Sequence, residues 1–280
     1  NLYFGKQYHI QPLLEVIDTV INQIHSEFYW GYSVEYYLSS INHCTPSYAG
    51  HFFKKHMLSI DQVSDLLKML PEEKKLSFDK AFADQLYLEY NEKKQYDDSE
   101  TLKVLQESMK GKKVLLTAPG KHLLDADEQI RKMLDDAEVV SVALNYYKAY
   151  NTDYVLATKQ EIYESAVADH KNIIVTSNVS QNTSEHIQVI NYKEWIKVDE
   201  GVNDSAIVIM LNLLKALQVK EVYLAGFDGF SANINENYVD KALRRPVSDE
   251  QAKERNESIK KFINGMKNAM EIYFMTESMY

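Results

Sequence analysis

Two stretches of the sequence share a pattern of residue types that indicates how the chain folds. Residues 112–121 (KKVLLTAPGK) and 220–230 (KEVYLAGFDGF) begin with charged residues, continue through aliphatic and β-branched residues, and end in a turn rich in Gly, Pro or Asp. The apolar runs are too short for a helix and are typical of strands buried in a parallel sheet. We therefore expect both stretches to be strands of such a sheet.

Short apolar runs alternate with helical patterns along the chain after residue 111. The strand candidates are residues 113–117, 139–142, 154–157, 173–176, 189–190, 221–224 and 272–274. The helix candidates are residues 123–135, 160–168, 205–217 and 248–269. Strands that alternate with helices imply crossover units and a mainly parallel sheet covered on both faces. The sequence predicts a Rossmann-like, three-layer α/β/α fold for residues 109–280.

The preceding part of the chain has helical spacing. Apolar residues recur at helical intervals in two sets, which are Leu13, Leu14, Ile17, Ile21 and Ile24, then Ile60, Val63, Leu66, Leu67 and Leu70. Ser59 with Gln62 matches a capping box, and Pro71 marks a stop. Residues 91–100 contain Tyr96 as their one large apolar side chain and predict a hinge before a helix at 101–109. With domains of roughly 100–200 residues, we expect a helical domain at 1–108 before the α/β domain.

Composition limits the classes of function. Hydrophobic residues make up 45% of the chain and charged residues 26%, which is typical of a globular protein. The net charge of -10 argues against nucleic-acid binding, and the absence of a long apolar run argues against membrane insertion. A single cysteine, Cys44, favours a reducing cytoplasm. Residues 1–5 (NLYFG) resemble a protease-cleavage tag that lacks its glutamine, or are native.

The first strand-to-helix turn is a predicted ligand-binding site, because open parallel sheets bind ligands at the carboxyl ends of their strands. Gly120 can adopt a backbone conformation closed to other residues. The amides after it would face an anion at the start of the helix, and Lys121 would add positive charge. The turn is neither a G-x-G-x-x-G nor a Walker motif, so an ordinary strand-to-helix turn is the alternative.

Polar residues after other strands are further site candidates. Asn145 would hydrogen-bond a base or sugar, or else cap a turn. Asn178 and Ser205 lie at the same predicted edge, although Asp204 or Ser205 is the expected N-cap of the next helix. Asp228, which lies between glycine-flanked aromatic residues, is the predicted catalytic residue, able to bind a hydroxyl, a cation or a general-acid proton. We expect these side chains to share one cleft with the first turn.

From residue 112 onward the chain resembles the Rossmann-type domain shared by archaeal 6-hydroxymethylpterin diphosphokinase-like proteins and bacterial sialyltransferases. The resemblance rests on KKVLLTAPGK, on VALNYY at residues 142–147, and on the helix that leads into KEVYLAGFDGF. It implies nucleotide contacts at Gly120 and Asn145, a nucleotide or nucleotide sugar as the ligand, and a transferase reaction. Sialyltransferases open the long helix with a Ser-Gly pair, where this chain has Ala206-Ile207.

The first hundred residues resemble a different family. Trp30-Gly31-Tyr32-Ser33, the helix after it, and LSIDQVSDLLKMLP at residues 58–71 are similar to the helical tail after the TIM barrel of 4-hydroxy-2-oxovalerate aldolase and related HMG-CoA-lyase-like enzymes. In that family the tail packs on the barrel and mediates partner contacts. The resemblance implies the C-terminal region of an aldolase-like lyase whose catalytic barrel, a partner, is missing from this chain. Aldolase activity is therefore not expected.

Three other groups of side chains have structural alternatives. His43, Cys44, His51 and His56 lack the spacing of a zinc site, so no metal is expected. Tyrosines beside Trp30, at Tyr29, Tyr32, Tyr36 and Tyr37, favour an interface, and hence a homo-oligomer, over a pocket. Lys241, Arg244 and Arg245 would close over phosphates, or else remain solvated.

Two functions follow from the sequence. The first is a nucleotide or nucleotide-sugar binding domain, with a transferase reaction. The second is a non-catalytic structural or oligomerisation appendage of the aldolase with a degenerate site. A pocket that joins Gly120, Asn145 and Asp228 would favour the first, and a filled sheet edge would favour the second.

Overall fold

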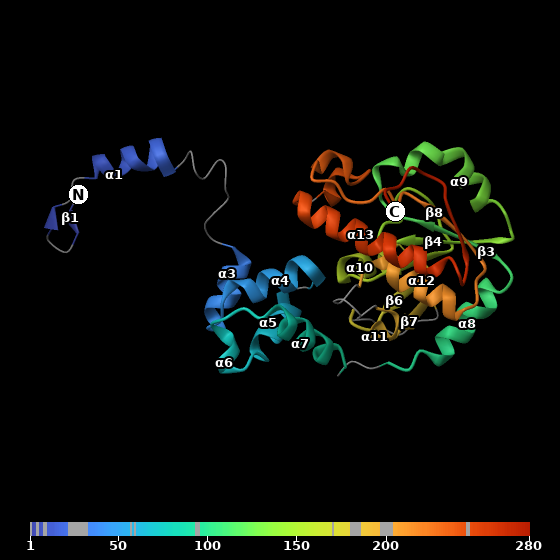
Figure 1. Cartoon of the computed structure of the whole chain (residues 1–280), viewed down its shortest axis with the longest axis horizontal. Coiled ribbons are helices and arrows are strands. Elements are labelled where there is room, and N and C mark those ends of the chain that lie inside the picture. Colours follow the sequence, from blue (N-terminus) through green and yellow to red (C-terminus); the bar gives the residue numbers. More distant parts are fainter. Residues whose placement is uncertain are drawn as a thin grey trace.

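The chain is described by a computed structural model that covers residues 2–3, 6–7, 10–21, 33–56, 58, 60–92, 96–169, 171–179, 186–196, 204–244 and 247–280 (Figure 1). Several sequence predictions fall outside these residues. They are the predictions that involve Ile24, Tyr29, Trp30, Gly31, Tyr32, Ser59 and Arg245.

Within the described residues, seven parallel strands form one sheet in the order β7-β6-β5-β4-β3-β8-β9 (Figure 1). Their bounds are β3 Lys113–Thr117, β4 Val139–Leu144, β5 Tyr154–Ala157, β6 Ile173–Thr176, β7 Ile187–Ile190, β8 Glu221–Ala225 and β9 Glu271–Phe274. The predicted parallel sheet and α/β class are confirmed. Each predicted strand is present, with ends shifted by two residues at most.

The order of the strands reverses once. From β3 to β7 the chain adds each strand on one side, and it then returns to place β8 and β9 on the other side of β3. Thr117 and Ala225, the last residues of β3 and β8, are paired in register. In open α/β sheets the carboxyl ends of two strands at such a reversal are the usual position of a ligand site.

Helices cover both faces of the sheet. They are η2 Lys121–Ala126, α9 Asp127–Leu134, α10 Gln160–Ala168, α11 Tyr192–Trp195, α12 Ala206–Ala216 and α13 Asp249–Met266, with short 3₁₀ turns η3 Ile234–Glu236 and η4 Lys241–Leu243. Val114 and Leu116 share a buried cluster with α12 and α13. Leu115, between them, shares another with Ile130 of α9. Successive residues of a strand point to opposite faces, which explains this division.

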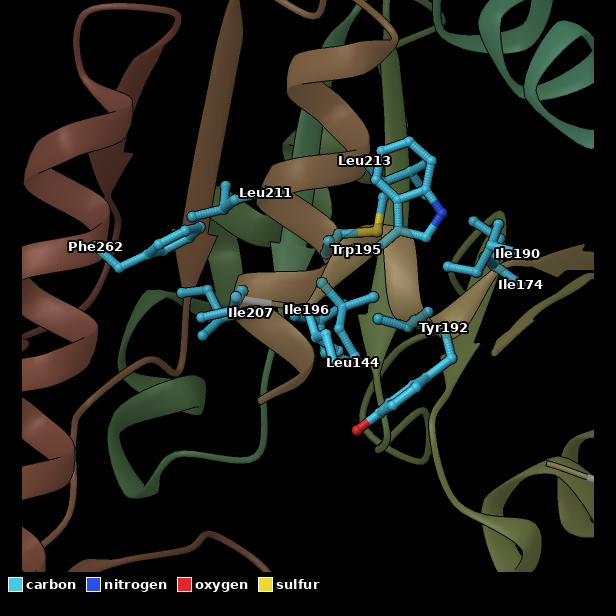
Figure 2. Packing of buried hydrophobic residues seen from close by; sticks show 14 of the residues in the cluster. Leu144, Ile174, Ile190, Tyr192, Trp195, Ile196, Ile207, Leu211, Leu213 and Phe262 are labelled. Atoms are coloured by element: carbon cyan, nitrogen blue, oxygen red, sulfur yellow. The ribbon is translucent and has the colours of Figure 1, made fainter. Parts of the chain in front are cut away.

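Helix α12 lies at the centre of the larger cluster. Its residues Ile207 and Leu211 pack among Leu144 of β4 and Phe262 of α13 (Figure 2). A helix that is apolar on nearly all sides is expected to be buried on most of them. Trp195 of α11 extends the same core toward β6 and β7 (Figure 2).

The described chain up to residue 109 is mainly helical. Its elements are α1 Gln11–Val16, the π-helical turn η1 Ile17–Ile21, α3 Val34–Ile41, α4 Pro46–His56, α5 Ile60–Lys68, α6 Glu72–Lys75, α7 Lys80–Glu92 and α8 Ser99–Met109. A two-residue pairing of β1 Leu2–Tyr3 with β2 Lys6–Gln7 precedes them. Pro71 is the N-cap of α6 and stands three residues after Lys68, the last residue of α5.

Helices α3, α4, α5, α7 and α8 share a core with the sheet. Tyr48, Leu66 and Tyr87 belong to the same buried cluster as Val142 of β4. Asp98 adds a polar link, because its Oδ2 accepts hydrogen bonds from Asn191 N (2.8 Å) and Trp195 Nε1 (2.9 Å). The division into two domains at residue 108 stays a prediction. Of the helices that the structure describes, none has the length and apolar character required to cross a bilayer.

Candidate functional site

The turns that follow β3 and β8 interlock. Ala118 N donates to Ala225 O and Gly120 N donates to Gly226 O, both at 2.9 Å. A Cβ atom on Gly120 would lie 2.3 Å from Gly226 O and 2.4 Å from Asp228 Oδ1. Real Cβ atoms essentially never approach other atoms so closely. Glycine is therefore required at residue 120 by the approach of the second turn.

Asp228 and His122 form a pair across these two turns. Asp228 is 8% exposed, and its Oδ2 accepts from His122 N at 2.8 Å and lies 3.0 Å from His122 Nδ1. Oδ1 is buried and, among the described residues, has no hydrogen-bond partner. A buried carboxylate oxygen in that state is costly and needs an explanation, of which a catalytic role is one.

The pairing determines what His122 offers to a ligand. When the neutral imidazole of His122 donates a hydrogen bond from Nδ1–H to Asp228, the other ring nitrogen, Nε2, keeps its lone pair. The His122 side chain is 35% exposed, whereas that of Asp228 is 8% exposed. Nε2 can therefore accept a hydrogen bond or a proton from a bound molecule, with the ring held by Asp228.

His122 is the site residue that the sequence reasoning missed. His122 stands directly after Lys121 in the predicted ligand-binding turn. A lone histidine in a sequence gives no sign that a carboxylate 106 residues further on will bind it. A histidine and an aspartate in two turns predicted at the same sheet edge were the available signal.

Several contacts brace the Asp228 turn. Asn256 of α13 receives a hydrogen bond from Phe230 N and donates one to Phe230 O, both at 2.8 Å. Residues after β9 hold the other side, since Ser278 Oγ donates to Phe227 O (2.6 Å) and Met279 N donates to Asp228 O (2.9 Å). The turn is thus fixed from two elements.

Tyr280 packs beside this turn. Burial raises the pKa of its hydroxyl well above the ordinary value, and electrostatic interaction with Tyr238 and Asp228 adds to the effect. The Tyr280 hydroxyl is accordingly neutral over the physiological range and can donate a hydrogen bond.

The predicted anion contact at the first turn is filled from within the protein. The amide of Gly120 is bonded to Gly226 O, and that of His122 is bonded to the Asp228 carboxylate. Lys121 is exposed beside them. Asp228 thus faces the start of η2, and ligand contacts at Gly120 and Lys121 stay a prediction.

Asn145 lies at the end of β4 in a left-handed conformation, with φ of 55°. Its side chain bridges to the end of β5. Nδ2 donates to Thr158 Oγ1 (2.8 Å) and Oδ1 accepts from Thr158 N (2.9 Å). This is the turn-stabilising alternative for Asn145, and its nucleotide contact stays a prediction.

Asn178 and Ser205 lie farther along the edge. Asn178 follows β6, which is separated from β3 by two strands, or by roughly 14 Å at about 4.8 Å per strand. Its Oδ1 is buried without a partner among the described residues, and its carbonyl accepts from Gln62 Nε2 of α5 (3.0 Å). Ser205 is the N-cap residue of α12. The structure thus brings Gly120 and Asp228 together but spreads the other candidates along the edge.

His51, from the predicted histidine and cysteine group, and Arg244, from the predicted phosphate-binding group, each have a partner within the protein. His51 Nε2 lies 2.8 Å from Asp84 Oδ1, and the described residues contain no group of three His, Cys, Asp or Glu suited to a metal ion. Arg244 donates to Tyr238 O and to Asn235 Oδ1, so its guanidinium is tied to its own loop. Lys241 is exposed.

A hollow of about 390 Å³ lies at the opposite, amino-terminal edge of the sheet. Val139 and Tyr154, which begin β4 and β5, line it together with Asp135 and Asp153. Asp153 is already bonded to Ser141 N and Oγ. Parallel α/β sheets bind ligands at the carboxyl edge, so the His122–Asp228 pair is the better candidate.

Comparison with protein-family models, with known protein sequences and with solved structures found no match for this chain. A function for it therefore has to rest on its own residues.

Proposed function

We propose that the α/β part of this chain is a Rossmann-like domain that binds a nucleotide or nucleotide sugar at the carboxyl ends of β3 and β8. The observation that carries the proposal is the His122–Asp228 pair at the point where the strand order reverses. A buried carboxylate that orients an accessible imidazole at this position is typical of a reactive or binding site.

Within this proposal the two residues have different roles. Asp228, the predicted catalytic residue, is 8% exposed and in this proposal acts by positioning His122. His122 Nε2 is the contacting atom. A transferase that uses a hydroxyl nucleophile requires a proton acceptor beside it, and His122 is suited to that role.

The aldolase context rests on the sequence resemblance. We infer that the chain is the C-terminal region of an aldolase-like protein of the cytoplasm that forms a homo-oligomer, with its helices as the barrel-associated tail. The metal and base of such an aldolase belong to the barrel. Metal-dependent cleavage of a 4-hydroxy-2-oxoacid is therefore not expected from these 280 residues.

One observation favours the second function, a structural appendage with a degenerate site. The interlocked turns of Gly120 and Gly226 fill the sheet edge between β3 and β8, and the Asn145 side chain is bonded to Thr158. In that case His122 would be exposed without any ligand to bind.

Thermal unfolding of the chain with nucleotides and nucleotide sugars separates the two functions. A ligand that binds the folded state raises the melting temperature. We expect at least one compound to do so, and H122N to reduce the increase. The matched control is H43N, because His43 is an exposed histidine with φ of 54° that asparagine tolerates.

The binding proposal predicts that H43N responds to the ligand as the parent does. If no compound in the panel stabilises the parent, the appendage reading replaces the nucleotide-binding one. If a compound stabilises the parent and H122N equally, binding occurs elsewhere on the chain.

A further inference from the structure

We infer that the His122–Asp228 site receives a neutral hydroxyl-bearing part of the ligand, the sugar, and keeps phosphate away from the start of η2. The inference rests on the proposed function and names which end of a nucleotide or nucleotide sugar faces β3. It reverses the orientation that the glycine turn alone suggests, in which backbone amides hold a phosphate.

Two backbone amides near the start of η2 are hydrogen-bonded within the protein. A phosphate held at the start of a helix accepts hydrogen bonds from free N–H groups. Here His122 N is bonded to Asp228 Oδ2 at 2.8 Å, and Gly120 N is bonded to Gly226 O at 2.9 Å. The protein's own carboxylate occupies the position that a phosphate would take.

The second argument is charge. Asp228 Oδ1 lacks a hydrogen-bond partner among the described residues, so part of the carboxylate charge is left uncompensated. Two like charges about 5 Å apart, at an effective dielectric constant of about 20, weaken binding by roughly a hundredfold. A phosphate beside this turn would experience that repulsion, whereas a neutral group would not.

The third argument is the hydrogen-bonding character of the accessible atom. With Nδ1 directed at Asp228 Oδ2 (3.0 Å), Nε2 of His122 is left as an acceptor on a side chain that is 35% exposed. A sugar hydroxyl can donate to it. The dianion of a phosphate ester, as in a nucleotide, has only acceptor oxygens and cannot.

Side-chain NMR of histidine in the full chain, at fixed pH and ionic strength, tests the inference. H122N identifies the His122 imidazole signal by its loss. The parent is titrated with methyl phosphate, at a pH where it is a dianion, and, separately, with adenosine, cytidine, guanosine and uridine. We expect at least one nucleoside to shift the His122 signal and phosphate to leave it unchanged.

Removal of the Asp228 charge, followed by the same phosphate titration, is the second measurement. D228N should gain phosphate binding at His122 by about ten- to a hundredfold relative to the parent. D125N is the matched control, because Asp125 is an exposed carboxylate on η2, the 3₁₀ turn that contains His122. It changes the net charge equally and should leave phosphate binding as in the parent.

Phosphate that shifts His122 in the parent as strongly as in D228N would overturn the inference, and so would the absence of a His122 shift with all four nucleosides. If D228N fails to fold, the parent titrations alone decide. The proposed function has a separate criterion. It fails if no nucleotide or nucleotide sugar stabilises the parent, or if every compound that does so stabilises H122N equally.

Discussion

At the scale of single residues, the site depends on a few close approaches. The sequence indicated Gly120 and Asp228 as important because each follows a short apolar run at a predicted strand end. It could not reveal that Gly120 lies under the Asp228 carboxylate or that His122 binds it, because these contacts join turns more than 100 residues apart. Lys121, predicted to face an anion, is exposed beside an anion that belongs to the protein.

Replacing Gly120 by alanine tests the close approach. Its Cβ would lie 2.3 Å from a backbone oxygen, so the two turns must separate. We expect G120A to lower the free energy of unfolding by about 2–4 kcal/mol, as measured by urea denaturation. The control is G265A, in helix α13, where a Cβ would contact nothing within 4 Å. That variant should gain about 0.5–1 kcal/mol. Equal stabilities for both variants would contradict the geometry.

At the scale of elements, the strands were the most predictable part of the molecule. Their short runs of Val, Ile and Leu are buried on both faces, so the pattern is strong. Helix starts were harder to locate. The helix predicted at residues 123–135 begins instead as a 3₁₀ turn at Lys121, where the Asp228 carboxylate binds the His122 amide. That bond comes from tertiary structure and leaves no local pattern.

The Asp98 carboxylate, at the start of α8, joins this helix to the segment that carries α11. Asp98 accepts hydrogen bonds from Asn191 N and Trp195 Nε1 and is 9% exposed. D98A would leave two buried donors without a partner. We expect a loss of about 2–4 kcal/mol in unfolding free energy. D97A is the adjacent control, because exposed Asp97 bonds only locally, to Ser99 N, and should cost about 0.5–1 kcal/mol. Similar losses for both would refute this role of Asp98.

The contact between α9 and the segment after β4 predicts a dependence on alkaline pH. Tyr150 Oη donates to Asp127 Oδ1, and burial followed by this hydrogen bond raises the pKa of Tyr150 to about 12. A raised pKa in the folded state contributes stability that is fully present below the ordinary pKa of about 10 and is lost as pH rises to about 12.

The stability advantage of the parent over Y150F should therefore shrink between about pH 10 and pH 12, as measured by urea denaturation at several pH values. Y96F is the control, since Tyr96 is exposed before α8. An advantage that stays constant over this window would show that the folded-state pKa of Tyr150 is not raised.

At the scale of the whole molecule, the helical part and the sheet are joined by one core. Tyr87 of α7 and Tyr192 of α11 bond through their hydroxyls at 2.6 Å, and Tyr192 also donates to Asp204 at 2.8 Å. The change of hydrophobic period near residue 111 predicted both halves. It could not show that they share a core, because a period describes one element and not the partner of its buried face.

The shared core predicts a single cooperative unfolding transition. Fluorescence of Trp195, which is buried beside β7, recorded in W30F because the chain has two tryptophans, and hydrogen exchange in α5 and α7 should report the same midpoint in denaturant. Two separate midpoints would instead support two independently stable domains divided near residue 108.

We propose that ligand binds where the strand order reverses, and a crystal structure with the most stabilising nucleotide or nucleotide sugar would locate it. We expect ligand density at the carboxyl ends of β3 and β8, with a sugar hydroxyl within hydrogen-bond distance of His122 Nε2 and the phosphate directed away from Asp228. Ligand in the hollow at the amino-terminal edge, beside Asp135 and Asp153, with His122 uncontacted, would contradict it.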